Sequence, residues 1–134
     1  MAITYFKRKG QVLLCHYPIN APKGEMIKLR PVVVVSPRIS TRPSICTVVP
    51  LSTTEPNPSR PYHHKIIENI ELPSPWNANE RWVKADMISV VSFERLDNFR
   101  CGRDENGKRI YNNFFVSDDD LNAIMVCVMR SLGL

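Results

Sequence analysis

Three polar side chains with suitable chemistry for cutting a phosphodiester stand at or near the ends of apolar segments. Arg30 precedes a valine-rich segment, Ser52 follows a second β-branched segment, and Asp86 lies in a third. Cutting RNA without a metal needs a proton acceptor, a cation for the phosphate and a group that assists the leaving oxygen. Arg30, Ser52 and Asp86 are therefore our catalytic candidates, arginine because it can donate two parallel hydrogen bonds. The alternative is that they only cap strands and form salt bridges.

Five further residues are candidates for binding RNA: Lys28, Thr53, His63, His64 and Lys84. The lysines would contact phosphate, and either histidine could act as an acid or base because histidine titrates near neutrality. A solvated surface position is the alternative for both histidines. Aromatic residues can stack on bases, but the apolar surroundings of Trp82 predict a core position, whereas Trp76, among prolines and polar residues, is expected to be exposed.

Metal sites and thiol nucleophiles are not expected. Cys15 and His16 are adjacent, as are His63 and His64, and neighbours on a strand point to opposite faces. The spacings match no structural zinc site. Cys15 lies in an apolar segment, where burial makes a thiol inert. We therefore expect neither a metal nor a cofactor.

Length and charge limit the class of protein. The 134 residues predict a single domain spanning 1–134, and the net charge of +5 with a pI of about 9.2 favours an acidic partner such as nucleic acid. Residues 1–10 lack an apolar signal segment, and no apolar stretch is long enough for a membrane helix. The four cysteines form no C-x-x-C pair. These features predict a cytoplasmic protein with no membrane partner.

The elements that would position the candidates are short strands followed by one helix. Asn106-Gly107 predicts a hairpin between two strands. Ser117 with three acidic residues predicts a helix start, Asp120 completing a loose capping box, and Gly133 predicts its end. The resulting fold class is α+β, mainly β, a small barrel with a C-terminal helix. The predicted strands cover residues 11–17, 31–36, 44–51, 62–68, 81–91, 99–103 and 109–115.

Several segments resemble the MazF/PemK family of toxins from type II toxin–antitoxin systems, in the order found there. The resemblance runs from about Gly10 to Leu132, and the details are similar to a PemK-like branch. Two positions depart from better-known members: Ser52 stands where threonine is common, and Met87 where many carry glutamine. The matching segments are residues 10–12 (GQV), 28–37 (KLRPVVVVSP), 48–54 (VVPLSTT) and 82–88 (WVKADMI), with Arg95-Leu96 downstream.

The resemblance implies an SH3-like barrel, the MazF/CcdB toxin fold, in a homodimer with RNA across the dimer surface. It implies sequence-specific, metal-independent cleavage of single-stranded RNA through a 2′,3′-cyclic phosphate, which inhibits translation and growth. A cognate antitoxin would inhibit the enzyme with a disordered acidic tail and bind DNA together with it. In this scheme Arg30 stabilises the transition state, Ser52 binds phosphate or orients the 2′-hydroxyl, and Asp86 transfers a proton or holds Arg30 in place.

Two other functions fit the same fold. A CcdB-like toxin would poison an enzyme such as gyrase by binding it, and would not need Arg30, Ser52 and Asp86 together. A degenerate member would bind RNA without cutting it, since fold does not fix function.

Overall fold

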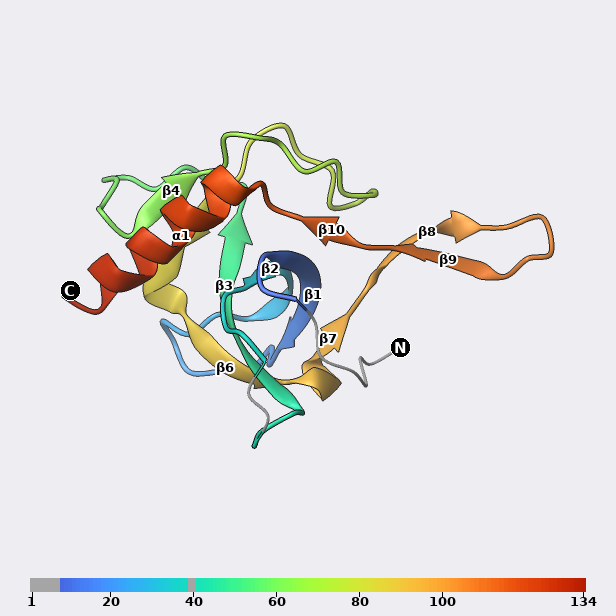
Figure 1. Cartoon of the computed structure of the whole chain (residues 1–134), viewed down its shortest axis with the longest axis horizontal. Coiled ribbons are helices and arrows are strands. Elements are labelled where there is room, and N and C mark those ends of the chain that lie inside the picture. The colour runs from blue at the N-terminus through green and yellow to red at the C-terminus, as the bar shows by residue number, and fades with distance from the viewer. Residues whose placement is uncertain (1–7, 39–40) are drawn as a thin grey trace.

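A computed structural model describes residues 8–38 and 41–134. It is mainly an antiparallel β structure with a helix at the C-terminal end, which confirms the predicted fold class (Figure 1). Residues 1–7, part of the segment where no signal sequence was expected, lie outside the described residues. So do residues 39 and 40, which fall between two predicted strands.

The main sheet has the strand order β10-β1-β2-β3-β5-β4, with β6 also pairing with β3 and β7 with β1. Its centre is built from β-branched and aliphatic residues, which favour a pleated, buried surface. The bounds are β1 Gln11–Tyr17, β2 Lys28–Val34, β3 Ile45–Ser52, β4 His63–Lys65, β5 Trp82–Lys84, β6 Ser89–Ser92, β7 Leu96–Asp97 and β10 Phe114–Phe115.

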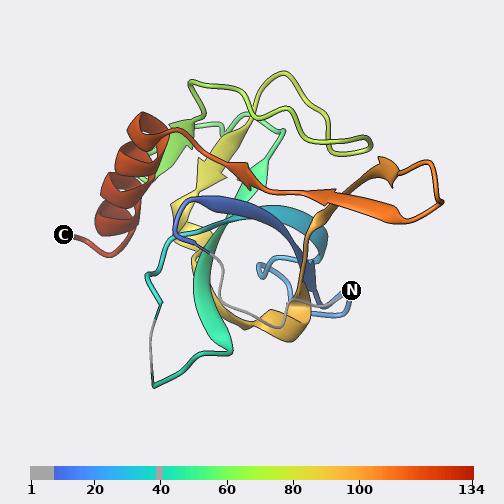
Figure 2. The same cartoon turned by 45° about the vertical axis from the view of Figure 1, so that its right-hand side comes forward.

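The strands β6, β3, β2, β1 and β7 curl into a ring (Figure 2). Among the described strands, β6 and β7 are not paired with each other, so backbone hydrogen bonds between strands do not complete this ring. The 3-10 turn η2 (Phe93–Arg95) instead links β6 to β7 along the chain. One set of alternating side chains fills the interior, including Leu13, Cys15, Val32, Val34 and Leu96.

The other set of side chains forms a second core beneath helix α1 (Asp118–Ser131). Val33, Val49, Leu51 and Val83 from the sheet belong to the same buried cluster as Ile124, Cys127 and Val128 from the helix. Ser117 caps the helix by accepting a hydrogen bond from the Asp120 amide at 3.1 Å. Gly133 ends it with φ +79°, so the predicted helix start and end are confirmed.

The predicted hairpin is also confirmed. Strands β8 (Phe99–Arg103) and β9 (Arg109–Asn112) form a separate two-stranded sheet that extends away from the ring (Figure 1). Gly107 takes φ +79° in the turn, and the Asp104 carboxylate accepts backbone hydrogen bonds from Asn106 and Lys108, both at 2.9 Å. The chain then enters β10, so the predicted strand 109–115 is interrupted at Asn113.

Two predicted strands are shorter than expected. The segment 81–91 divides into β5 and β6 because the 3-10 turn η1 (Ala85–Met87) separates them. The segment 62–68 is a strand only from His63 to Lys65. Beyond it, the amides of Ile67 and Glu68 bind the Asp120 carboxylate, so they are not available for strand pairing.

Candidate nucleic-acid interface

Arg30 and Ser52 lie across neighbouring strands. Strands β2 and β3 pair Val32 with Pro50, and continuing that register by two residues places Arg30 opposite Ser52. Directly opposed residues share a face of the sheet. Both residues line a pocket of about 200 Å³, together with Thr53, Trp76, Asn77 and Arg81 among others. The structure therefore brings two of the three catalytic candidates together.

The Arg30 guanidinium is only partly engaged by the protein. Its Nε donates to the Ile27 carbonyl at 3.0 Å, which fixes the plane of the group. Within residues 8–38 and 41–134, no carboxylate lies within ion-pair distance of it. A half-buried arginine without a carboxylate partner is suited to an anionic ligand. Lys28, at the start of the same strand, is exposed.

Ser52 ends β3 in a tight turn. Its Oγ accepts a hydrogen bond from the Thr54 amide at 3.1 Å and lies 3.4 Å from the Thr54 carbonyl oxygen. The amide fixes the direction of the hydroxyl, and Thr53 stays exposed beside it. The hydroxyl is thus held in place at the pocket wall.

A second group of candidates lies on β4, β5 and η1. The strands pair His63 with Lys84, and the Nε2 atom of His63 lies 3.9 Å from an Asp86 carboxylate oxygen. His63 Nδ1 accepts a hydrogen bond from the Arg60 amide at 3.1 Å. The neutral ring therefore carries its proton on Nε2, facing Asp86. This arrangement makes His63 a hydrogen-bond donor, because its lone pair is already used.

The two groups occupy one face of the sheet but different pockets. Leu51 and Val83 pair on the opposite face, so the alternation places Ser52 and Lys84 together on this one. His63, Lys84 and Asp86 line a pocket of about 400 Å³ that shares no lining residue with the Arg30 pocket.

Asp86 also lines an adjoining cavity together with Tyr17, which feels the charge of Arg30. Burial raises the pKa of Tyr17, while the nearby charge of Arg30 opposes the rise. Asp86 is thus paired with His63, and among the described residues no hydrogen bond or ion pair joins it to Arg30. The idea that Asp86 holds Arg30 in place is not retained, because the Ile27 carbonyl makes the contact that holds it.

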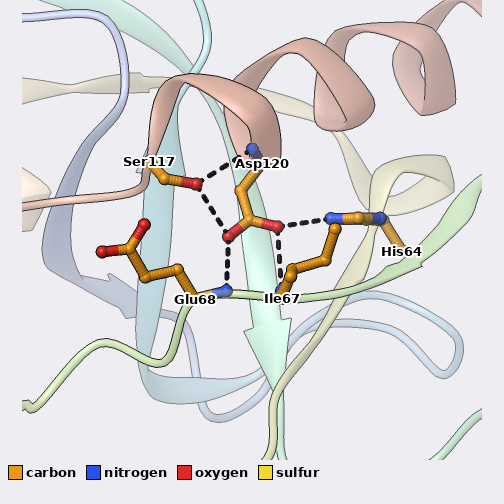
Figure 3. Close-up of polar contacts among 5 residues, drawn as sticks. All are labelled: His64, Ile67, Glu68, Ser117 and Asp120. Carbon is orange, nitrogen blue, oxygen red and sulfur yellow. Dashed lines mark hydrogen bonds and ion pairs between the residues drawn. The ribbon is translucent and has the colours of Figure 1, made fainter.

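His64 faces the other side of β4, away from these pockets. Its Nε2 donates to Asp120 at 2.7 Å, and its side chain is 15% exposed (Figure 3). We therefore do not retain His64 among the proposed RNA contacts. The adjacent His63 points toward Asp86, as the alternation of a strand requires.

Asp120 anchors helix α1 to the chain after β4. Its fully buried carboxylate accepts hydrogen bonds from the amides of Ile67 and Glu68, from His64 and from the Ser117 hydroxyl (Figure 3). Burial alone would raise the pKa of Asp120, but these hydrogen bonds outweigh it and lower the pKa. Asp120 therefore stays charged in the interior, where its carboxylate joins helix α1 to the chain after β4.

Arg81 is a residue of the pocket that the sequence did not single out. It is 2% exposed, and its Nη2 donates to the carbonyls of Trp76 at 2.6 Å and Ile70 at 3.5 Å. Its Nε has no partner among the described residues. Burial lowers the pKa of Arg81. Arg81 thus fixes the loop that carries Trp76, half-buried at the pocket wall, and no sequence pattern marks it because arginine is normally exposed.

Two of the cysteine thiols are buried in the ring interior. Burial raises the pKa of Cys15 to about 11 and that of Cys46 to about 12, so both thiols are protonated near neutrality. Trp82, 8% exposed, belongs to the core as predicted.

Across the described ranges, no group of three or more histidine, cysteine or acidic side chains is arranged to hold a metal ion. No described helix is long and apolar enough to cross a membrane.

Comparison with known sequences gives a family and a relative. A model of PemK-like, MazF-like toxins of type II toxin–antitoxin systems matches residues 8–131. The chain is also 35% identical over 122 residues to YifN, an uncharacterized protein of Escherichia coli (strain K12), with 77% of this chain and 80% of YifN covered.

Solved structures share the fold. MazF from Deinococcus radiodurans superposes with a TM-score of 0.64 at 15% identity, covering 98% of this chain and all of that one. An endoribonuclease from a mycobacterial species gives a TM-score of 0.56 at 20% identity, covering 96% and 92%. A mycobacterial endoribonuclease in complex with its cognate antitoxin gives 0.50 at 20% identity, covering 96% and 94%. At these identities, the likeness concerns the fold.

Proposed function

Because the chain belongs to the PemK-like, MazF-like family of type II toxins, we propose that it is a metal-independent endoribonuclease that cuts single-stranded RNA at short sequences. The observation that carries the proposal is the Arg30–Ser52 pocket, where a fixed guanidinium without an acidic partner faces a fixed hydroxyl. Cleavage of messages would stop translation and growth. The proposed setting is a homodimer in the cytoplasm, inhibited by a cognate antitoxin.

The proposed reaction begins with the scissile phosphate in the Arg30 pocket. The RNA 2′-hydroxyl oxygen attacks the adjacent phosphorus, an O2′–P bond forms, and the P–O5′ bond breaks. The products are a 2′,3′-cyclic phosphate and a 5′-hydroxyl. Arg30 neutralises the charge that builds on the phosphate oxygens, and the Ser52 hydroxyl binds the phosphate or orients the nucleophile.

Proton transfer is assigned to Asp86, which accepts the 2′-hydroxyl proton while water supplies a proton to the leaving oxygen. The hydroxide left by that water then takes the proton from Asp86, which restores the carboxylate and a water molecule. His63 directs its Nε2–H toward Asp86 at 3.9 Å, since its other nitrogen already accepts from the Arg60 amide. Lys84, Lys28 and Thr53 are proposed to bind the neighbouring backbone. Because Asp86 and Arg30 line different pockets, we propose that bound RNA spans both and brings the 2′-hydroxyl to Asp86.

The test is digestion of a long unstructured RNA in excess chelator, with mapping of the 5′ ends. We expect discrete cuts from the wild type and a loss of about 10²–10³ in rate for Arg30→Ala, as for removal of an oxyanion-stabilising donor. Arg130→Ala, at an exposed position on α1, is the matched control and should cut normally. Wild-type speed from Arg30→Ala would refute the assignment. Intact RNA with toxicity on expression would instead indicate an enzyme-poisoning toxin.

A further inference from the structure

The β8–β9 hairpin carries positive charge that the cleavage site does not use. It extends away from the ring, and nearly all residues from 100 to 112 are exposed (Figure 1). This stretch contains four arginine or lysine residues and two acidic ones. Three of the cations are arginines, the side chain best suited to bidentate contact with phosphate.

The strand register gathers the three arginines on one face. Arg100 pairs with Tyr111 and Arg103 pairs with Arg109, and directly opposed residues share a face. Arg109 and Tyr111 are two residues apart on β9, so they also share that face. One surface of the hairpin therefore presents three guanidinium groups and a phenol.

A bulge at Gly102 produces this arrangement. Arg100 and Arg103 are three positions apart, so regular alternation would place them on opposite faces. The register shifts between them, and Gly102 takes φ +90°, a conformation that side chains disfavour. Bulges re-aim side chains in this way. Here the bulge turns Arg103 to the same face as Arg100.

The arrangement is unfavourable without a ligand. Like charges directly opposite on paired strands destabilise the pair, as Arg103 and Arg109 do here. Arg103 donates to the Gly107 carbonyl at 2.8 Å, and Asp104 is engaged with turn amides. Among the described side chains, no carboxylate lies within ion-pair distance of the three arginines.

The cleavage pocket leads toward this surface. It shares Leu29, Pro75 and Trp76 with a neighbouring pocket of about 360 Å³, which Arg100 also lines. Asp97 in that second pocket is 2.6 Å from the Nε2 atom of His16 and so is partly neutralised when His16 is charged. The two pockets form a groove that runs from the Arg30 pocket past Trp76 to the base of the hairpin.

We propose that the arginine face of the β8–β9 hairpin is a second RNA-binding surface, which holds the single strand on one side of the cleavage pocket. This inference rests on the proposed ribonuclease function. It assigns the hairpin a role in capturing RNA and leaves the chemical step to the pocket. Tyr111 among the arginines, and the groove that connects the hairpin to the pocket, favour RNA over an acidic protein, because stacked rings and guanidinium groups suit bases and phosphates.

The salt dependence of RNA binding tests the proposal. The probe is a fluorescent 20-nucleotide 2′-O-methyl RNA, which lacks the nucleophile and is not cut. The variant is Arg100→Gln/Arg103→Gln/Arg109→Gln in the full chain. For single-stranded RNA, the slope of log K against log salt concentration becomes shallower by about 0.7 for each phosphate contact that is removed. We therefore expect the slope to decrease by about 2, with affinity at low salt reduced at least tenfold.

The control removes the same charge elsewhere: Arg38→Gln/Arg42→Gln/Arg130→Gln, at three exposed positions. This control variant should keep most of the wild-type slope of log K against log salt concentration. Replacing the hairpin arginines with lysine should restore much of the slope, because lysine keeps the charge. On a cleavable RNA, the glutamine variant should raise KM and leave kcat within about twofold, since the reacting groups are untouched.

The outcomes separate this inference from the proposed function. If the wild type cuts RNA and the hairpin variant binds like the control, the hairpin inference is wrong and the nuclease stands. If the wild type does not cut RNA but the hairpin variant loses slope, the surface stands without the nuclease. If the variant loses binding to a polyglutamate peptide and binds RNA normally, the surface recognises an acidic protein, and the RNA inference is overturned.

Discussion

Replacing Asp120 with alanine should destabilise the protein more than any other single change to an acidic residue at the start of helix α1. Its carboxylate is fully buried and accepts four hydrogen bonds, one from the Ile67 amide at 2.9 Å and one from the Glu68 amide at 3.0 Å. Removing one partner of a buried charged pair costs about 3–5 kcal/mol, because the remaining donors are left unsatisfied. That is a large part of a typical stability of about 5–15 kcal/mol.

Thermal unfolding followed by circular dichroism measures the effect. A loss of 3–5 kcal/mol should lower the melting temperature by roughly 10–20 °C for a chain of this length. Asp119→Ala is the matched control, because Asp119 is exposed in the same helical turn. It should lose only the helix-dipole interaction, about 0.3–1 kcal/mol. Equal melting temperatures for the two variants would refute the role assigned to the Asp120 network.

The hydrogen bonds to Asp120 also determine how the free energy of unfolding changes with pH. The pKa of Asp120 is lowered in the folded state, so its contribution is complete above the unfolded value of about 3.9. It is lost as pH falls through the folded pKa. The stability difference between the wild type and Asp120→Asn should therefore shrink below about pH 4. A difference that grows with acid would contradict the stated cause of the shift.

Two further predictions concern chemistry. Asp86→Asn should slow RNA cleavage by about 10²–10⁴-fold and remove the acidic limb of the pH–rate profile, because the proton acceptor is lost. A uniform drop in rate with that limb intact would assign Asp86 a positioning role instead. In the folded protein a thiol reagent should label Cys101, which is half-buried, whereas Cys15 and Cys46 should react only after unfolding because they are buried. Mass spectrometry measures the labelling. Rapid labelling of all thiols would show that the ring interior opens in the native state.

Local patterns predicted the elements whose signals are contained in a few neighbouring residues. The valine segment, the Asn-Gly turn and the serine cap of α1 all act through nearby backbone, and the structure has all three. The division of segment 81–91 was harder to predict, because apolar alternation continues across it while the chain changes direction at η1. An alternation of apolar and polar residues does not show where a strand stops pairing with its neighbour.

The site was predictable only in part, because its geometry depends on strand register. That Arg30 and Ser52 meet could be expected from their places at strand ends, and the β2–β3 register, extended by two residues beyond Val32–Pro50, places them opposite each other. The pairing of Asp86 with His63 depends on how β4 and β5 align, which no local pattern fixes. Asp120 looked like part of a capping box, yet its carboxylate reaches the Ile67 and Glu68 amides more than fifty positions away.

Strand β4 separates stability from the proposed chemistry. His63 and His64 are adjacent, but the alternation of the strand sends one to Asp86 in the open pocket and the other to Asp120 under the helix. The helix network fixes the backbone after β4 through the amides of Ile67 and Glu68, and before β4 the Arg60 amide holds the His63 ring. The buried Asp120 carboxylate therefore anchors β4 from one face, while His63 faces Asp86 from the other. The hairpin lies outside this network and pairs with no strand of the main sheet, so it can carry RNA-binding charge without disturbing the pocket.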